Sequence, residues 1–236
     1  MKRTGRALAL CAAVTSLLPS AASAQSKTFA LESPGGLRLH NVVAEAATLL
    51  GKKGVKLVFP PDQPRPQAEV DQLAVLEGAE FSNGVIEAEI AGAPAPGAGE
   101  GARGFVGIAF RVQPDNKTYD AFYLRPTNGR ADDQVRRNHS TQYISHPEWP
   151  WFRLRKETPE KYESYVDVVP ATWTKVKIEV RGDKARLFVN DGEQPVLVVN
   201  DVKSGANAKG AVALWLGPGT IAHFRNLTVK ADPDTR

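Results

Sequence analysis

The sequence has 236 residues, 42% of them hydrophobic, so it is long enough to bury a core. Its formal net charge of +4 sets 30 basic against 26 acidic residues. Three of the basic residues lie within the first six positions, and without them the chain is almost neutral, which argues against the basic field that a nucleic-acid partner requires.

The first 24 residues have the pattern of a secretory signal peptide. Lys2, Arg3 and Arg6 form a positive start, and an apolar run follows at 7–18. Ala22-Ser23-Ala24 is a small-residue cleavage site. The apolar run is shorter than the about 20 residues that a membrane-spanning helix needs. We therefore expect cleavage after residue 24 and no transmembrane segment in the mature protein.

The mature chain is expected to be one domain, residues 25–236, exported to a bacterial periplasm or to the exterior. Cys11 is the only cysteine and leaves with the leader. Disulfides, thiol catalysis and thiolate metal sites are therefore excluded from the mature chain. Its fold must be stabilised by the core alone.

Short β-rich runs separated by Gly, Pro, Asn and Asp dominate the rest, which predicts an all-β sandwich. The run 85–91 alternates apolar and acidic residues, as a half-buried strand does. Loops are expected at 60–67, which holds four prolines, and at 92–101. The expected strands, in chain order, cover residues 37–50, 55–59, 73–76, 85–91, 104–112, 119–125, 173–180, 185–189, 195–199, 210–216 and 221–230.

Three expected strands carry small side chains beside an aromatic one on their outward faces. Such a face is a shallow floor with a stacking surface, and it suits a sugar, whose C–H faces pack on aromatic rings. The alternative is that another layer of the protein packs on the small residues. The residues concerned are Gly107 and Ala109, Ala121 and Tyr123, and Ala211, Ala213 and Trp215.

Residues 119–167 interrupt this simple pattern with all five tyrosines and two of the four tryptophans of the chain. Binding sites commonly lie on irregular segments held by a rigid frame. We predict that the segment lines a binding face; a self-packed structural flap is the alternative. The predicted ligand-binding residues are Tyr123, Arg125, Asn128, Arg130, Arg136, Gln142, Tyr143, Trp149 and Arg155.

Catalytic signals in the same segment are weaker. His139 is the candidate general base, because an imidazole titrates near neutral pH, although a structural role is the alternative for it. Glu163 or Asp132 is the candidate acid, and Arg125 or Arg136 would stabilise a developing oxyanion. Asp132-Asp133 could contact calcium but lacks the spacing of a calcium loop. Whether the protein binds a metal ion stays open, and no cofactor is indicated.

Several runs resemble the concanavalin A-like lectin/glucanase superfamily, with laminin-G-like domains and the 3-keto-disaccharide hydrolase family as the nearest relatives. The resemblance implies a two-sheet antiparallel jelly-roll β-sandwich with a concave, carbohydrate-facing sheet. The E-x-D-x-x-E strand of laminarinase-type members is absent, the closest run being Glu87-Ala88-Glu89. The runs that carry the resemblance are 81–90, 104–111, 173–180 with 185–190, 210–215, and 222–227.

Three functional hypotheses follow. The first is an exported domain that binds a carbohydrate or a sugar-derived ligand on its concave face. The second is a glycoside hydrolase or lyase, including one acting on 3-keto glycosides. The third is an envelope protein-interaction module, which would show a mainly apolar patch rather than a cleft lined by arginine and aspartate.

Overall fold

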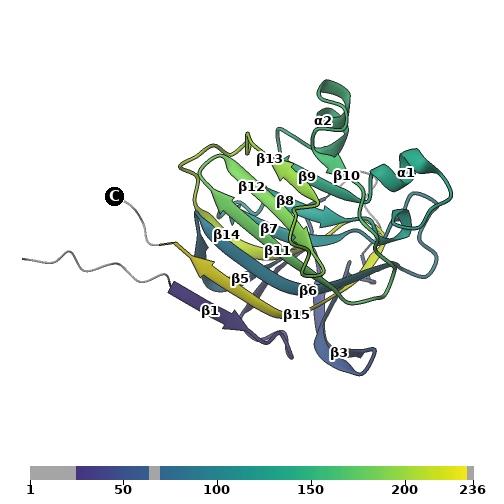
Figure 1. Ribbon diagram of the computed structural model, residues 1–236. Helices are drawn as coiled ribbons and strands as arrows, with labels where there is room; N and C mark the ends of the chain where they lie inside the picture. Colours follow the sequence, from purple (N-terminus) through teal and green to yellow (C-terminus); the bar gives the residue numbers. More distant parts are fainter. Residues whose placement is uncertain (1–24, 64–69, 233–236) are drawn as a thin grey trace, which may run out of the picture.

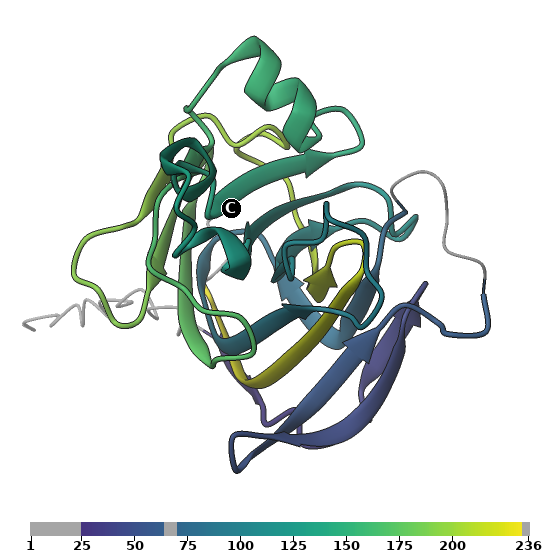
Figure 2. The same ribbon diagram turned by 90° about the vertical axis from the view of Figure 1, so that its right-hand side faces the viewer.

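The computed structural model describes residues 25–63 and 70–232, and the predicted leader lies outside these residues. Two antiparallel sheets face each other (Figures 1 and 2), which confirms the predicted sandwich. The first sheet has the order β13 (Leu197–Val199), β12 (Lys184–Val189), β11 (Thr174–Arg181), β6 (Gly84–Pro94), β15 (Thr220–Ala231), β4 (Lys52–Val58) and β3 (Val43–Leu49), with β1 (Gln25–Phe29) paired to β15.

The second sheet carries the predicted binding face. Its order is β10 (Glu163–Ser164), β9 (Thr141–His146), β8 (Tyr119–Leu124), β7 (Val106–Val112), β14 (Gly210–Leu216), β5 (Leu73–Phe81) and β2 (Leu37–His40). Residues distant in sequence therefore become neighbours, because β14 lies beside both β7 and β5.

Alternating apolar residues form the core between the sheets. In β6, Ile86 and Ile90 are buried, while Glu87 faces outward and pairs with Lys230. From the second sheet, Phe110 and Phe122 stack at 6.2 Å between ring centroids. Each such buried side chain stabilises the fold by about 1.5–3 kcal/mol.

β7 and β8 are buried along their whole length, so both of their faces are covered. One face of β8 carries Phe122 into the core, as the alternation predicts. Its other face carries Tyr119 and Tyr123, which are only 2% exposed although they point away from the core. A second group of residues must therefore cover the outer face, and this group forms the site described below.

The expected strand 37–50 is divided in the structure. Asn41 has a φ of 53°, a left-handed conformation that Asn tolerates, and it separates β2 from β3. β2 pairs with β5 in the second sheet, whereas β3 pairs with β4 in the first. The predicted hairpin at 173–189 is confirmed by the pairing of β11 with β12.

The segment 119–167 adds three short helices beside β9 and β10: η1 (Pro126–Asn128), α1 (Gln134–Asn138) and α2 (Trp151–Glu157). In Figure 1, α1 and α2 stand at the margin of the sandwich. The Asp133 carboxylate caps α1 by accepting a bond from the Arg136 backbone N–H at 2.9 Å. None of the helices among the described residues has the length and apolar character needed to cross a membrane.

Candidate functional site

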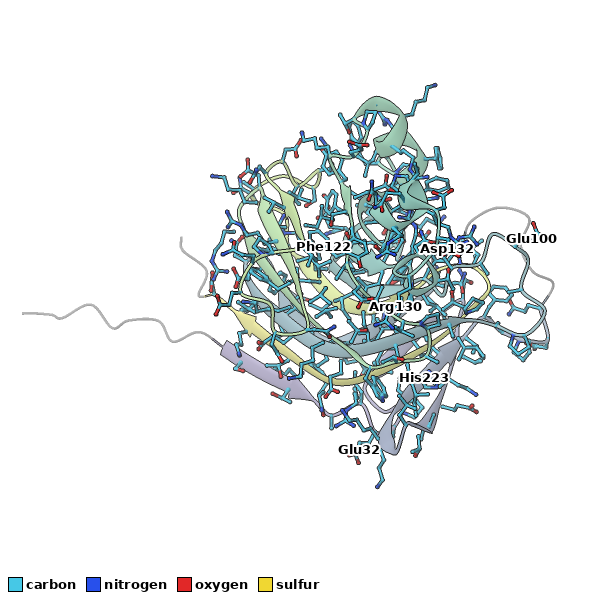
Figure 3. All side chains as sticks on the ribbon, turned by 45° about the vertical axis from the view of Figure 1, so that its right-hand side comes forward. Glu32, Glu100, Phe122, Arg130, Asp132 and His223 are labelled. Atoms are coloured by element: carbon cyan, nitrogen blue, oxygen red, sulfur yellow. The ribbon has the colours of Figure 1, made fainter. Side chains whose placement is uncertain are left out.

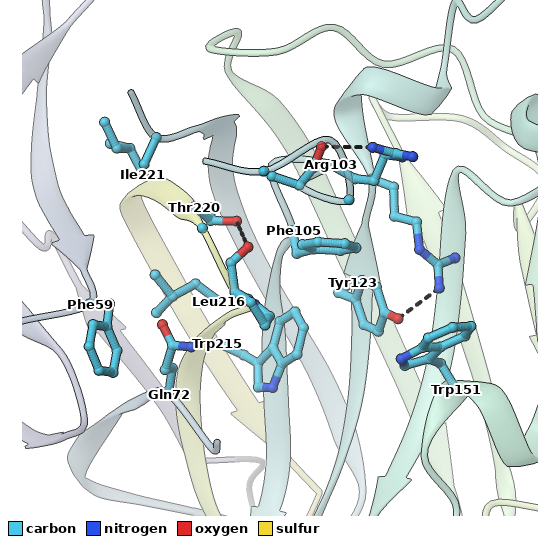
Figure 4. A pocket seen from close by; sticks show the side chains of 18 of the residues that line it. Phe59, Gln72, Arg103, Phe105, Tyr123, Trp151, Trp215, Leu216, Thr220 and Ile221 are labelled. Carbon is cyan, nitrogen blue, oxygen red and sulfur yellow. Dashed lines mark hydrogen bonds between the residues drawn. The ribbon is translucent and has the colours of Figure 1, made fainter. Parts of the chain in front are cut away.

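A cavity of about 1110 Å³ opens on the outer face of the second sheet (Figure 4). Ligand sites for small molecules commonly measure about 300–1,000 Å³, so this space accommodates a small molecule or a short oligomer. Its floor comes from β8, β9 and β14. Its walls come from the loops after β4 and β6, from η1 and α1, and from the start of α2.

The centre of the floor is a stacked pair of rings, Tyr123 and Trp215, 4.6 Å apart between centroids and inclined by 23°. Both residues pair in register with Gly107, which lies on the strand between them. A Cβ on Gly107 would lie 2.6 Å from the Cβ of Tyr123 and 2.2 Å from the carbonyl oxygen of Phe122. Gly107 therefore lets the two rings lean together over β7.

The predicted small-residue floor is not open to the cavity. Ala109, Ala121 and Ala213 have no exposed surface. From β14, the Trp215 Nε1–H reaches across β7 and donates to the Tyr119 hydroxyl on β8 at 3.2 Å. The layer that packs on the small residues thus consists of the aromatic side chains of the same sheet, and the floor that a ligand meets is aromatic.

Beyond Tyr123, the floor ends in a buried ionic cluster. Arg125 follows β8 and is 5% exposed. Its guanidinium donates to Glu163 Oε1 at 3.1 Å, to Gln142 Oε1 at 2.9 Å and to the Tyr123 hydroxyl at 2.9 Å. From α2, Arg155 donates to both carboxylate oxygens of Glu163, with 2.9 Å to Oε2. One carboxylate therefore serves two guanidinium groups.

This cluster fixes the charge states of its members. Burial acts to raise the pKa of Glu163, but the hydrogen bond from Arg155 and the charges of Arg125 and Arg155 outweigh it, and the pKa is lowered. Glu163 is therefore ionised at neutral pH. His139 Nε2 lies 3.7 Å from Glu163 Oε2. Burial lowers the pKa of His139, Glu163 opposes this, and the two arginines add to it, so the imidazole is neutral at pH 7.

A second polar cluster lies on the other side of the stacked rings. Asp71 Oδ1 accepts from the Tyr119 hydroxyl at 2.7 Å and lies 3.0 Å from His146 Nδ1. His146 also lines the cavity. A carboxylate at Nδ1 favours the tautomer that leaves Nε2 as a proton acceptor. The site thus contains two imidazoles, each beside a carboxylate.

The turn at η1 connects the cavity wall to the ionic cluster of Arg125 and Glu163. Asn128 Nδ2 donates to the His139 carbonyl at 3.1 Å, and Asn128 Oδ1 accepts from Arg136 Nε at 3.0 Å. Arg125 donates to the same His139 carbonyl at 3.0 Å. Asn128 of η1 and Arg125, which follows β8, are therefore joined at the carbonyl of His139, the residue after α1.

Six of the residues predicted from the sequence line the cavity, and two more support it from behind. Glu163 and Gln142 are the supporting residues, and both bond to Arg125. The six that line the cavity are Tyr123, Arg125, Asn128, Arg136, His139 and Arg155.

The other four predicted residues lie elsewhere. Tyr143 points into the core, with its ring 5.4 Å from that of Phe122. Trp149 is covered by Arg153 and Lys203, at 3.9 and 4.7 Å from its ring. Figure 3 labels Arg130 and Asp132 on the loop after η1, where both are exposed and where Arg130 pairs with Asp167. Their predicted roles in binding or catalysis stay predictions.

Several cavity residues were not predicted from the sequence. Tyr119 could have been found, because it lies four positions before Tyr123 on the same strand face. Trp151, Phe105 and Arg103 also line the cavity. Asp71 and Gln72 come from a loop far from the segment 119–167, and only the fold brings them to the site. Nowhere in residues 25–63 and 70–232 do three or more His, Cys, Asp or Glu side chains gather in a group able to hold a metal ion.

Solved structures with the same architecture include a carbohydrate-binding module, CBM66, from Bacillus subtilis, with a TM-score of 0.52, 15% identity, and coverage of 82% of this chain and 95% of that one. A Bacillus subtilis protein of unknown function with a galectin-like fold has a TM-score of 0.51 and 13% identity, and the match covers 89% of this chain and 97% of that one. The Crh5 transglycosylase in complex with NAG has a TM-score of 0.50 and 11% identity, and the match covers 90% of this chain and 86% of that one. No curated protein sequence matches the chain significantly.

At these identities the likenesses concern the fold, and they place the chain among the concanavalin A-like jelly-roll β-sandwiches, as the sequence resemblance implied. Residues 60–230 match the model of the 3-keto-alpha-glucoside-1,2-lyase-like domain. The chain belongs to this family. The resemblance to 3-keto-disaccharide hydrolases stated from the sequence is thereby confirmed.

Proposed function

We propose that this protein binds a sugar or a sugar-derived ligand in the cavity on its second sheet. The observation that carries the proposal is the combination of aromatic rings and planar polar groups around one space of about 1110 Å³. Phe105 and Trp151 are partly exposed and face this space beside the stacked Tyr123 and Trp215 (Figure 4). The apolar faces of a sugar ring pack on such surfaces.

Polar groups for the hydroxyls of a sugar are present around the rings. Arg136 and His139 line the wall on the η1 side. Gln72, which also lines the cavity, is 2% exposed, and its Oε1 has no hydrogen-bond partner among the described residues. A buried acceptor without a partner is unfavourable by about 1–3 kcal/mol, and a ligand hydroxyl would supply the missing donor.

The family and the similar folds also support sugar binding. The family is described by an activity on a glucoside, and one similar fold is a carbohydrate-binding module. An envelope protein-interaction module is less well supported, because this cavity is lined by arginines, histidines and amide side chains as well as by apolar groups.

Two tryptophans close together in sequence provide the test. Trp151 lines the cavity, whereas Trp149 does not, and both are partly exposed. Calorimetric titration with a panel of neutral and acidic glycans should find a ligand that binds the wild type. Its affinity should fall about tenfold or more in Trp151→Ala, which corresponds to a loss of about 1.4 kcal/mol in binding free energy. Trp149→Ala should bind as the wild type does. Absence of binding to every sugar class would contradict the proposal.

A second candidate is an enzyme of the lyase type. A 1,2-lyase acting on a 3-keto glucoside removes the proton at C2, which the adjacent ketone acidifies. As the C1=C2 double bond forms, the bond between C1 and the glycosidic oxygen breaks, and that oxygen takes up a proton from the protonated base, directly or through water, so that no proton is gained or lost overall. The reaction therefore needs an unprotonated base and a positive group near the enolate oxygen.

The observation that favours this candidate is the neutral imidazole of His139 in the cavity wall, which Arg136 also lines. Glu163 does not suit the acid role, since its lowered pKa leaves it ionised. Asp132, exposed and outside the cavity lining, has no support for that role from the geometry. We propose His139 as the base that accepts the C2 proton.

Incubation with 3-keto glycosides, with and without divalent metal, tests the enzymatic candidate. His139→Ala should lose turnover, while His40→Ala, on the edge strand β2 and outside the cavity lining, should keep it. Unchanged turnover in His139→Ala would remove the assignment. His146→Ala is the companion variant, because His146 is the other imidazole that lines the cavity.

We also propose that the protein functions outside the cytoplasm, because its first 24 residues have the pattern of a cleaved leader. N-terminal sequencing of the protein from a periplasmic or culture fraction should find Gln25 as the first residue. A chain that keeps Met1 and stays in the cytoplasmic fraction would contradict this.

A further inference from the structure

Positive charge is concentrated around the cavity. Four arginines line it, whereas Asp133 is its one acidic lining residue among those described. Asp133 is exposed, and its carboxylate is engaged in capping α1. The four arginines are Arg103, Arg125, Arg136 and Arg155.

The four arginines differ in how their charge is compensated. Arg125 and Arg155 share the carboxylate of Glu163. Arg103 and Arg136 form no ion pair with any carboxylate in the described part of the chain, and the acceptors they bond are neutral. Arg103 donates to the backbone oxygens of Glu100 and Ala102.

Arg136 likewise donates to amide, hydroxyl and backbone oxygens, those of Asn128 and Thr127. The charge of Glu100 acts on Arg103 without forming an ion pair with it; Glu100 is exposed, and Figure 3 shows it on the loop at the periphery of the molecule. Two guanidinium groups of the cavity wall thus form no ion pair among the described residues.

Arg103 and Arg136 are also close to each other. Both meet Thr127: its backbone N–H donates to the Arg103 carbonyl at 3.3 Å, and its hydroxyl accepts from Arg136 Nη2 at 3.3 Å. Burial lowers the pKa of Arg103, the charges of Arg136 and then Arg125 lower it further, and the charge of Glu100 opposes them without outweighing them. Like charges held together in a partly buried wall are relieved by an anion placed between them.

We infer that the ligand of this cavity is a negatively charged sugar, whose carboxylate or sulfate group lies between Arg103 and Arg136. The inference rests on the proposed sugar binding and narrows its substrate class. Guanidinium groups bind planar oxyanions through paired N–H donors, which gives strength and orientation together. In Figure 4, Arg103 is drawn above Phe105, whose ring centroid lies 6.1 Å from that of Tyr123, the partner of Trp215 in the stacked pair. The charged end of the ligand therefore meets the arginines while its ring lies over the aromatic floor.

Matched sugars test the inference. Methyl glucosides of both anomers and neutral glucose disaccharides are titrated against the corresponding glucuronides and 6-sulfates. The wild type should bind at least one charged member about tenfold more tightly than its neutral counterpart. Raising the salt from about 0.05 M to about 0.5 M should weaken the charged ligand and leave the neutral one unchanged. Comparison of the glucuronide with the sulfate identifies the anionic group.

Charge removal at the two arginines provides the second arm. Arg103→Gln and Arg136→Gln should each remove most of the preference for the charged sugar, with affinity for the neutral sugar changed much less. Arg186→Gln is the matched control, because Arg186 is exposed on β12 of the other sheet and does not line the cavity. The melting temperature shows whether each variant is folded. If a variant is unfolded, the salt titration of the wild type still tests whether the ligand is anionic.

The outcomes separate the two proposals. Equal affinity for neutral and charged members, with no effect of either substitution, would overturn the anionic class and leave sugar binding standing. Failure of every member to bind would overturn sugar binding itself, and the inference with it.

Discussion

The buried carboxylate of Glu163 offers a direct test of how the site is held together. Glu163→Gln keeps the shape of the side chain but removes the charge that serves Arg125 and Arg155. The Glu163 side chain is 2% exposed and that of Arg125 is 6% exposed, so neither charge can be hydrated. We expect the variant to fold with clearly reduced stability.

The magnitude follows from the burial of each partner. Breaking a buried ion pair by removing one member costs about 3–5 kcal/mol. Arg155 is 35% exposed and regains water, so its share of the loss is small. We therefore expect the free energy of unfolding to fall by the lower end of this range, about 3 kcal/mol. In a domain of this size that corresponds to a fall of roughly 6–12 °C in melting temperature.

The assay is thermal and denaturant unfolding of the wild type, Glu163→Gln and Glu148→Gln. Glu148 is 78% exposed and lies 3.8 Å from Arg153, so its replacement should change stability by no more than about 1 kcal/mol. Since the pKa of Glu163 lies below its ordinary 4.5, its contribution is complete above pH 4.5 and is lost as the pH falls through the native pKa. The gap between wild type and variant should narrow below that pH. A Glu163→Gln melting temperature within about 2 °C of the wild type at pH 7 would refute the reasoning.

Three further predictions follow from other parts of the structure. Gly107→Ala should destabilise the fold and disturb ring stacking, because its Cβ would lie 2.2 Å from the Phe122 carbonyl oxygen; near-ultraviolet circular dichroism and unfolding check this. Burial raises the pKa of Asp201, but bonds from Lys161, Tyr162 and Lys203 lower it to about 2, so Asp201→Asn should lower the melting temperature at pH 7 and progressively less between pH 3.8 and about 2. If the protein is a lyase, turnover should fall as the pH drops below 6.5 and through the lowered pKa of His139, where the base becomes protonated; a flat profile over that window would contradict its role.

Much of the fold was predictable because strand alternation is a local property. The alternation that assigns Phe122 to the core and Tyr123 to the outer face can be read from β8 alone. Where the backbone leaves the ideal strand, the prediction was less accurate, as at Asn41, whose left-handed conformation divides one expected strand between two sheets.

The candidate site was predictable only in part, because its geometry depends on strand register and on distant loops. That Trp215 faces Tyr123 across Gly107 follows from pairing between β14, β7 and β8, which no local pattern specifies. Trp149 and Trp151 look alike in the sequence, yet α2 begins at Trp151 and brings only that indole to the cavity.

Roles inside the segment 119–167 were harder still to separate, because the same residue types serve support and contact. Glu163 resembles a catalytic acid in the sequence, but two arginines keep it ionised. Arg125 resembles a ligand contact, but its donors are used by Glu163, Gln142, Tyr123 and a backbone carbonyl. Such partners become visible only when the strands are assembled.

This division of roles has a consequence for recognition. Arg125 holds the Tyr123 hydroxyl, and its guanidinium lies 5.0 Å from the centre of that ring, so the buried ionic cluster also fixes the aromatic floor. A floor that is ordered before binding loses little side-chain entropy when a ligand arrives. Substitution of the supporting residues should therefore change stability and affinity together. Arg103 and Arg136 form no ion pair among the described residues, so their substitution should change affinity more than stability. This difference separates contact from support.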